Sequence, residues 1–182
     1  LAEELAKASV FILVATGARK LELTSLTDHI FYAGICALGF AFVENLGYFA
    51  LSSSAGEFVV MTLVRTGFGV FGHPLYTTAT AVGIWAWRTK GGLWKAAVGY
   101  IAACLLHGLW NGGPTLLAGS LGLDDTGQLA AMILVYIVLF VPVFIGTIIM
   151  TTRNRRNEYE AVRSQLPLMV EAGLVTPAEA DM

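Results

Sequence analysis

Long apolar segments are the feature of this sequence that most restricts its fold. They run roughly over residues 5–18, 29–51, 58–87, 93–119 and 128–150. About 20 apolar residues let a helix cross a bilayer, where backbone groups must be hydrogen-bonded internally. The composition agrees with membrane residence, since 56% of the residues are hydrophobic and only 13% are charged. We therefore expect an all-α, polytopic transmembrane bundle of about five helices.

The third apolar segment is long enough to tilt or to break. Gly72, His73 and Pro74 interrupt it, and a proline removes one backbone donor from the helical ladder. The sequence therefore predicts a kink near His73.

The two ends of the chain suggest its domain limits. The sequence starts at Leu1 without a signal peptide, inside a helix-like segment, so we expect that one or more upstream spans are missing. After Arg156 the apolar character is lost. We predict a membrane bundle over residues 1–152 and a short cytosolic tail over residues 153–182, with one helix broken near Pro167, Gly173 or Pro177.

Basic residues lie almost entirely in loops of one side. The loops at residues 52–57 and 119–128 contain none. The positive-inside rule therefore predicts an integral, multi-pass membrane protein with its carboxyl terminus in the cytoplasm. The nine basic residues of that side are Arg19, Lys20, Arg88, Lys90, Lys95, Arg153, Arg155, Arg156 and Arg163.

Charge and cysteine content argue against nucleic-acid binding and against cysteine-based sites. The net charge is −2 and the basic residues form no stripe, so nucleic-acid binding has no electrostatic basis. Cys36 and Cys104 stand apart within apolar segments, which does not indicate a disulfide framework or a thiolate zinc site.

Ionisable residues occur inside the apolar segments, where a charge costs at least a few kcal/mol. A rise of about 1.5 Å per residue places the most buried of them at about 18–24 Å above the cytoplasmic boundary. His107 and Asn111 are four positions apart and share one helix face. We expect a polar cluster in the outer half of the bilayer, formed by Glu3, Glu4, Lys7, Glu44, Arg65, His73, His107 and Asn111.

Most of these residues also have an ordinary interpretation. His73 could serve the kink, His107 and Asn111 could join helices, and Arg65 could extend to the bilayer surface. Glu44 is the hardest to explain in this way, because apolar residues surround it in the sequence.

Four motifs in order resemble the PrsW family of membrane-embedded proteases, which is distantly related to the CAAX prenyl endopeptidase and Abi group. They are Glu3-Glu4-Leu5-Ala6-Lys7, Phe40 to Glu44 with Asn45 and Tyr48, Arg65 through His73 to Thr77, and His107 to Asn111. The resemblance implies an endopeptidase of the bacterial cell membrane that cleaves a membrane-anchored protein, in the best-known case an anti-sigma factor.

The residues suggest a mechanism for such a reaction. Glu3 or Glu4 would take a proton from water and return it to the leaving amine, while Glu44 orients that water. His107 and Asn111 would stabilise the oxyanion. His73 is expected among the catalytic residues, and supporting roles are expected for Lys7, Arg65, Asn45 and Thr77.

Three alternatives remain open. Glu44, His73 and His107 could bind zinc, but no HExxH motif is present, so the sequence favours catalysis without a metal cofactor. A proton-coupled transporter or channel could use the same buried Glu and His residues. A noncatalytic membrane scaffold would need none of them.

Overall fold

The structure is a computed structural model that describes residues 1–17, 22–67, 69 and 71–180. Within these residues every regular element is helical, which confirms the expected all-α fold class. The chain divides into two compact units, residues 1–147 and residues 148–182. Arg19 and Lys20, two of the residues used to predict orientation, lie outside the described part of the chain.

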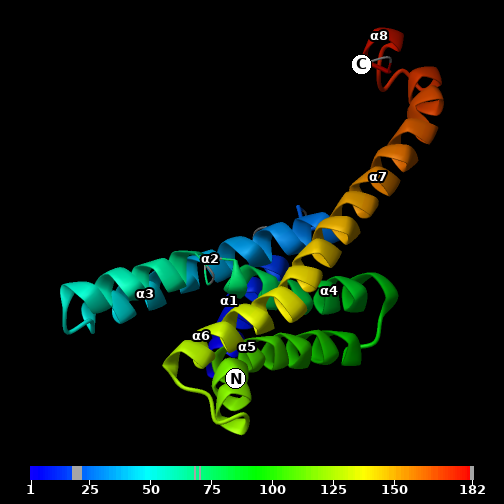
Figure 1. The fold of residues 1–182 in the computed structure, drawn as a ribbon. Helices are drawn as coiled ribbons and strands as arrows, with labels where there is room; N and C mark the ends of the chain where they lie inside the picture. Colours follow the sequence, from blue (N-terminus) through cyan, green and yellow to red (C-terminus); the bar gives the residue numbers. More distant parts are fainter. Residues whose placement is uncertain (18–21, 68, 70, 181–182) are drawn as a thin grey trace. The chain divides into compact units, whose positions relative to one another are not determined.

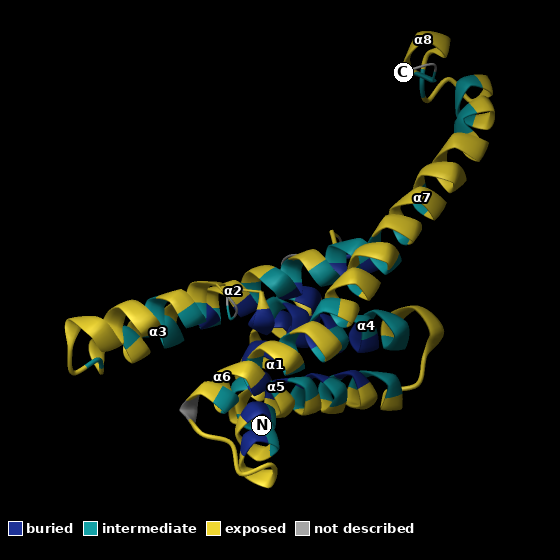
Figure 2. Ribbon diagram, viewed as in Figure 1, coloured by how far each residue is buried: buried dark blue, intermediate teal, exposed yellow. Residues whose placement is uncertain are grey.

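Helix α4 is central to the first unit. It packs against α2 and α5, while α1 contacts α2, α4 and α5 (Figure 1). Most of the dark, buried residues lie on these helices, whereas α3 has no buried residue (Figure 2). The helices are α1 (Ala2–Thr16), α2 (Leu26–Ala50), α3 (Ala55–Gly67), α4 (Gly72–Lys90), α5 (Trp94–Ser120), α6 (Asp125–Val135), the π-helix η1 (Tyr136–Phe140) and α7 (Val141–Glu171).

Helices α4 and α5 form an antiparallel hairpin with direct backbone contact. A Cβ atom added to Gly99 would lie 2.9 Å from the Cα atom of Gly83 and 2.5 Å from the carbonyl oxygen of Ala79. The short connection between the helices contains Gly91 and Gly92 with φ values of +65° and +84°, a conformation that glycine adopts without strain. The hairpin thus gives α4 and α5 a fixed register.

Helices α1 and α2 each bury one narrow face. The buried residues of α1 follow helical spacing, and two of them, Glu4 and Lys7, are charged. On α2 the buried residues Ala33, Ala37 and Ala41 recur every fourth position, and their small side chains let neighbouring helices approach. Ser25 fixes the start of α2, because it forms a reciprocal capping box with Asp28.

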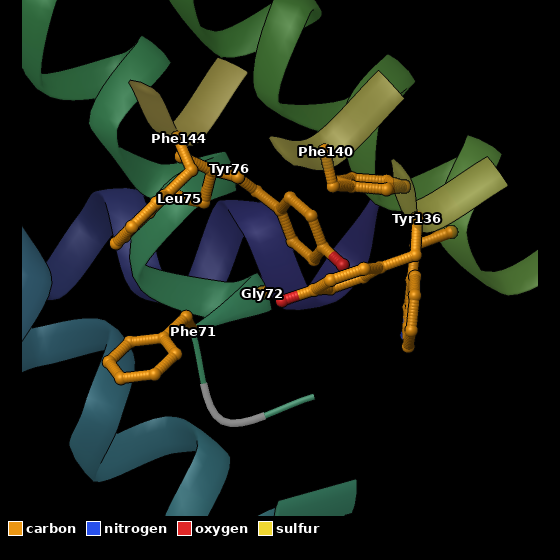
Figure 3. Close-up of a pocket in the computed structure, with 8 residues that line it drawn as sticks. Phe71, Gly72, Leu75, Tyr76, Tyr136, Phe140 and Phe144 are labelled. Atoms are coloured by element: carbon orange, nitrogen blue, oxygen red, sulfur yellow. The ribbon is translucent and has the colours of Figure 1, made fainter. Parts of the chain in front are cut away.

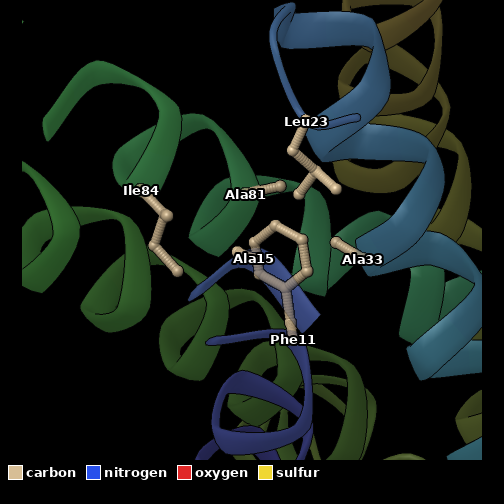
Figure 4. Close-up of a cluster of buried hydrophobic side chains, with 6 residues drawn as sticks. All are labelled: Phe11, Ala15, Leu23, Ala33, Ala81 and Ile84. Atoms are coloured by element: carbon tan, nitrogen blue, oxygen red, sulfur yellow. The ribbon is translucent and has the colours of Figure 1, made fainter. Parts of the chain in front are cut away.

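Two apolar clusters hold the first unit together. One joins α4, α5 and η1 through Leu75, Tyr76, Ala103 and Phe140, and three of these side chains are drawn in Figure 3. The other joins α1, α2 and α4, and Figure 4 shows the ring of Phe11 at its centre among Ala15, Leu23, Ala33, Ala81 and Ile84.

The third apolar segment is divided into two helices, as its length and its Gly-His-Pro sequence predicted. Helix α3 ends at Gly67 and α4 begins at Gly72, so the break lies just before His73. Pro74 occupies the first turn of α4, where the missing N–H has no intrahelical partner to lose. His73 is therefore held at the beginning of a helix.

Three helical segments of the described chain are long and apolar enough to cross a membrane: Leu26–Ala50, Ala55–Lys90 and Thr126–Glu171. The sequence had suggested about five crossings. Helix α1 has only 15 described residues. The mean hydropathy of α5 is lowered by Lys95, His107 and Asn111. The two helices that do not qualify are thus the ones that carry much of the predicted polar cluster.

The second unit contains the rest of α7 and the short helix α8 (Pro177–Ala180). Pro167 lies inside α7, which continues to Glu171, and Gly173 follows with a φ of +69°. The interruption of the helical tail therefore falls at Gly173 and not at Pro167. The assignment of a catalytic bundle to residues 1–152 and a cytosolic tail to residues 153–182 stays a prediction.

Candidate active site

Five helices supply the residues that the sequence singled out. Nine of the ten meet around one part of the first unit. The exception is Thr77, which is buried one turn beyond His73 with no hydrogen-bond partner for its Oγ1 among the described residues. The residues are Glu3, Glu4 and Lys7 on α1, Glu44 and Asn45 on α2, Arg65 on α3, His73 and Thr77 on α4, and His107 and Asn111 on α5.

His107 lies between two carboxylates of α1. Its Nδ1 is 2.7 Å from Oε1 of Glu4, and its Nε2 is 3.4 Å from Oε2 of Glu3. A carboxylate can only accept, so Nδ1 carries the hydrogen and donates it to Glu4. In the neutral imidazole Nε2 then has a lone pair that faces another acceptor, Glu3. Such a pair requires a proton or a cation between the two atoms.

Lys7 connects Glu4 with His73. Its Nζ forms an ion pair with Oε1 of Glu4 and lies 3.1 Å from Nδ1 of His73. The side chains of Lys7 and Glu4 are at most 1% exposed. Because an ammonium group only donates, Nδ1 of His73 accepts and Nε2 carries the hydrogen. That N–H is directed at Oε2 of Glu44, 3.0 Å away.

Arg65 fixes Glu44 from the opposite side. Its guanidinium donates to Oε2 of Glu44 and to Oδ1 of Asn45, and it lies over the ring of Tyr48 at 3.9 Å. The Arg65 side chain is therefore directed into the cluster, and it joins α3 to α2. Glu44 in turn accepts from both Arg65 and His73.

Aromatic rings surround the two histidines. Tyr76 stacks on His107 with ring centroids 4.9 Å apart, and Phe40 lies 5.7 Å from His73. Lys7 faces both rings, at 5.2 Å from Phe40 and 5.8 Å from Tyr76. Apolar walls lower the local dielectric constant and so strengthen the charge interactions within them. Sequence reasoning missed Tyr76, although its position three residues after His73 on one helix was a usable signal.

A cavity of about 110 Å³ opens beside this network. A water molecule occupies about 30 Å³ of liquid volume, so the cavity has room for a few waters or for one substrate group. Asn111 lies in its wall without taking part in the hydrogen bonds described above. The wall is formed by Glu44, Met61, Val64, Arg65, Gly69, His73, Tyr76, His107, Trp110 and Asn111.

Glu3, His73 and His107 form a group that fits a metal ion. Each offers one ligand atom, and these atoms lie within 4.8 Å of one another. Two imidazoles and one carboxylate are the protein ligands of many catalytic zinc sites. The buried Oε2 atoms of Glu3 and Glu4 have no hydrogen-bond partner in the described structure. The three carboxylates of the cluster also exceed its two cations by one charge when the histidines are neutral.

This ligand group differs from the one expected from the sequence, Glu44, His73 and His107. Oε2 of Glu44 accepts from both Arg65 and the N–H of His73. The positive charge of Arg65 therefore already neutralises that carboxylate. Glu3 takes its place. His73 would have to release either Lys7 or Glu44 to offer a nitrogen lone pair.

Comparison with known proteins gives one match. Residues 1–147 match the family model described as "PrsW family intramembrane metalloprotease". No curated protein and no solved structure matches the chain. The matched region coincides with the first compact unit and includes every residue of the cluster.

Proposed function

The chain belongs to the PrsW family of intramembrane metalloproteases, and from this we propose that it hydrolyses a peptide bond of a membrane-anchored protein in the cavity beside His107. Membership makes it a membrane-embedded peptidase. The observation that carries the finer proposal is the position of His107. Its two ring nitrogens face Glu4 and Glu3, and its side chain lines a cavity with room for a few water molecules.

The two adjacent glutamates have different surroundings, which suggests different roles. Glu4 is fully buried and bound to both Lys7 and His107. It is therefore suited to orient His107 and to fix the hydrogen on Nδ1, as carboxylates behind catalytic histidines do. The Glu3 side chain is 41% exposed, and its Oε2 has no hydrogen-bond partner among the described residues. In a reaction without a metal ion, Glu3 is the better candidate to take a proton from a water beside Nε2 of His107. With a metal ion bound, Glu3 would serve as a ligand instead.

Glu44 acts on His73 in this proposal, and not directly on water. It is held by Arg65 and accepts from Nε2 of His73. The chain from Arg65 through Glu44 to His73 fixes the orientation of that ring. Asn111 keeps the role expected from the sequence, because its amide lies in the cavity wall and can donate to a developing oxyanion.

A divalent metal ion would be held by Glu3, His73 and His107. When bound it supplies Lewis-acid polarisation of the scissile carbonyl. The family description and the excess negative charge of the cluster favour this metal-dependent version over the metal-free one that the sequence favoured. Lys7 and Glu4 would continue to position the two histidines.

The first substrate class to test is a membrane-anchored anti-sigma factor, which the family resemblance implies. The decisive experiment compares purified wild-type protein with Glu3→Gln and His107→Ala variants in detergent. Each is incubated with solubilised membrane proteins, and new peptide termini are identified by mass spectrometry. We expect termini that appear only with wild-type protein. Equal cleavage by the His107→Ala variant would refute the proposal, and metal analysis of the same samples tests the ligand assignment.

A further inference from the structure

A second, apolar pocket adjoins the catalytic cavity. Its volume is about 160 Å³. Tyr76 and Trp110 line both hollows, so one wall separates them. The lining residues are Phe71, Gly72, Leu75, Tyr76, Trp110, Tyr136, Phe140 and Phe144, and Figure 3 shows their side chains grouped around the pocket.

We infer that this pocket binds a large apolar side chain of the substrate, leucine-sized or aromatic, at the residue next to the cleaved bond. The inference rests on the proposed function, and it adds the sequence preference of the same site. Position is the first argument. A side chain that enters the pocket past Tyr76 leaves its own backbone beside His107, because Tyr76 stacks on that ring at 4.9 Å.

The size of the pocket fits such a side chain. An apolar cavity of about 150 Å³ in another protein is large enough to bind benzene, and this pocket is of similar volume. Its lining contains no charged residue. A charged or strongly hydrated side chain would therefore lose its water without gaining a partner.

The π-helix explains why the pocket has an aromatic wall. Tyr136, Phe140 and Phe144 follow one another at steps of four residues, and an α-helix drifts by about 40° over each such step. A π-helical turn contains more residues than an α-helical turn, so across η1 the same step falls short of a full turn. The shortfall across η1 offsets the excess rotation across the following α-helical step. All three rings therefore line one pocket.

The hydroxyl of Tyr76 favours a peptide over a lipid acyl chain as the occupant. Tyr76 is 1% exposed, and its hydroxyl has no hydrogen-bond partner in the described structure. A buried hydroxyl without a partner is costly, whereas the backbone of a bound substrate can satisfy it. The acyl chain of a lipid offers neither a donor nor an acceptor.

Substitutions at the rim and at the floor of the pocket should change its shape in opposite ways. Phe144 on the rim is 41% exposed, so Phe144→Ala should fold and should widen the entrance. Leu75 on the floor is buried, and Leu75→Phe should fill the pocket. Ile145 is a matched control, since it follows Phe144 on α7, is 49% exposed and does not line the pocket.

The test uses single-span membrane reporters whose segment next to the membrane is randomised. They are reconstituted with each enzyme variant, and the cleaved bonds are located by mass spectrometry. For wild-type protein we expect Leu, Met or aromatic residues at one fixed position beside the cleaved bond. Alanine at that position should lower kcat/KM about tenfold or more.

The variants should change this preference in predictable directions. Leu75→Phe should shift the preference to small residues, and Phe144→Ala should weaken it, whereas Ile145→Ala should leave it unchanged. Tyr76→Phe should lower kcat/KM for every reporter while the preference remains.

Cleavage that needs His107 but shows no apolar preference would overturn the pocket assignment alone. So would a Leu75→Phe enzyme that folds, cleaves and keeps the wild-type preference. Absence of any His107-dependent cleavage would refute the proposed function, and the pocket assignment with it. Activity that follows the lipid chain length and ignores the reporter sequence would identify a lipid pocket instead.

Discussion

Substitutions at Glu4 and Lys7 should have strongly coupled effects on the free energy of unfolding. Both side chains are at most 1% exposed and form a direct ion pair. Glu4→Gln keeps the shape of the side chain but leaves the Lys7 ammonium without its counter-charge. Removing one partner of a buried pair typically costs about 3–5 kcal/mol. Lys7→Met should cost a similar amount, because Glu4 then loses its cation.

The double variant should recover much of this loss. Replacing both members of a buried ion pair with uncharged groups is often neutral, since no unpaired charge remains. We therefore expect the combined effect of Glu4→Gln and Lys7→Met to be smaller than the sum of the two single effects by at least about 2 kcal/mol. Activity should stay low in the double variant, because a glutamine amide cannot replace the carboxylate that orients His107.

The native cysteines provide the assay. Cys36 and Cys104 are both half-buried and free, so a thiol-reactive dye reports their exposure during thermal unfolding in detergent. Each single variant should lower the unfolding midpoint by about 6–20 °C, at about 2–4 °C per kcal/mol for a chain of this size. Strictly additive effects, or single variants as stable as wild type, would show that the two charges do not depend on each other.

Four further predictions concern the site, the metal, the packing and the orientation. Arg65→Met should lower kcat/KM about 10- to 100-fold because Glu44 loses its anchor, and Arg65→Lys should recover only part of it, since lysine lacks the fork of guanidinium donors. Chelation should abolish cleavage and added divalent ion should restore it, whereas full activity of metal-free protein would favour glutamate catalysis alone. Gly99→Ala should destabilise the protein by about 1–3 kcal/mol in the dye assay because the new Cβ meets the α4 backbone, while Gly119→Ala, which meets nothing within 4 Å, should not. A fluorescent protein fused to the carboxyl terminus should fluoresce in a bacterial host; a dark but inserted fusion would reverse the predicted orientation.

Much of the fold could be predicted because long apolar segments in a membrane have few structural solutions. The all-α class and the division of the third segment near Pro74 followed from this constraint. The number of crossings was harder to predict. Helix α1 has only 15 described residues, and polar residues lower the hydropathy of α5, so length and composition select three segments of the described chain and not five.

The list of cluster residues was also accessible from the sequence, because ionisable groups are costly in an apolar segment unless they have partners. Their partners were not. The sequence did not show that Glu44 is held between Arg65 and His73. It also left open which of Glu3 and Glu4 acts as the base, whereas in the structure only Glu4 is enclosed by Lys7 and His107. Adjacent residues point in directions about 100° apart on a helix, and which direction faces the core depends on how α1 packs.

The sequence alone thus determined that this chain is a helical membrane protein, that it resembles the PrsW proteases, and which polar residues are costly enough to require partners. Those properties are local, since they depend on residue type and on spacing within one helix. Only the tertiary structure brings ligand atoms of Glu3 and the two histidines within reach of one another, and places an aromatic pocket next to the cavity beside His107, with Tyr76 in the wall of both. Both depend on the register between separate helices, which is set by contacts such as the one between Gly83 and Gly99 and cannot be read from any single segment.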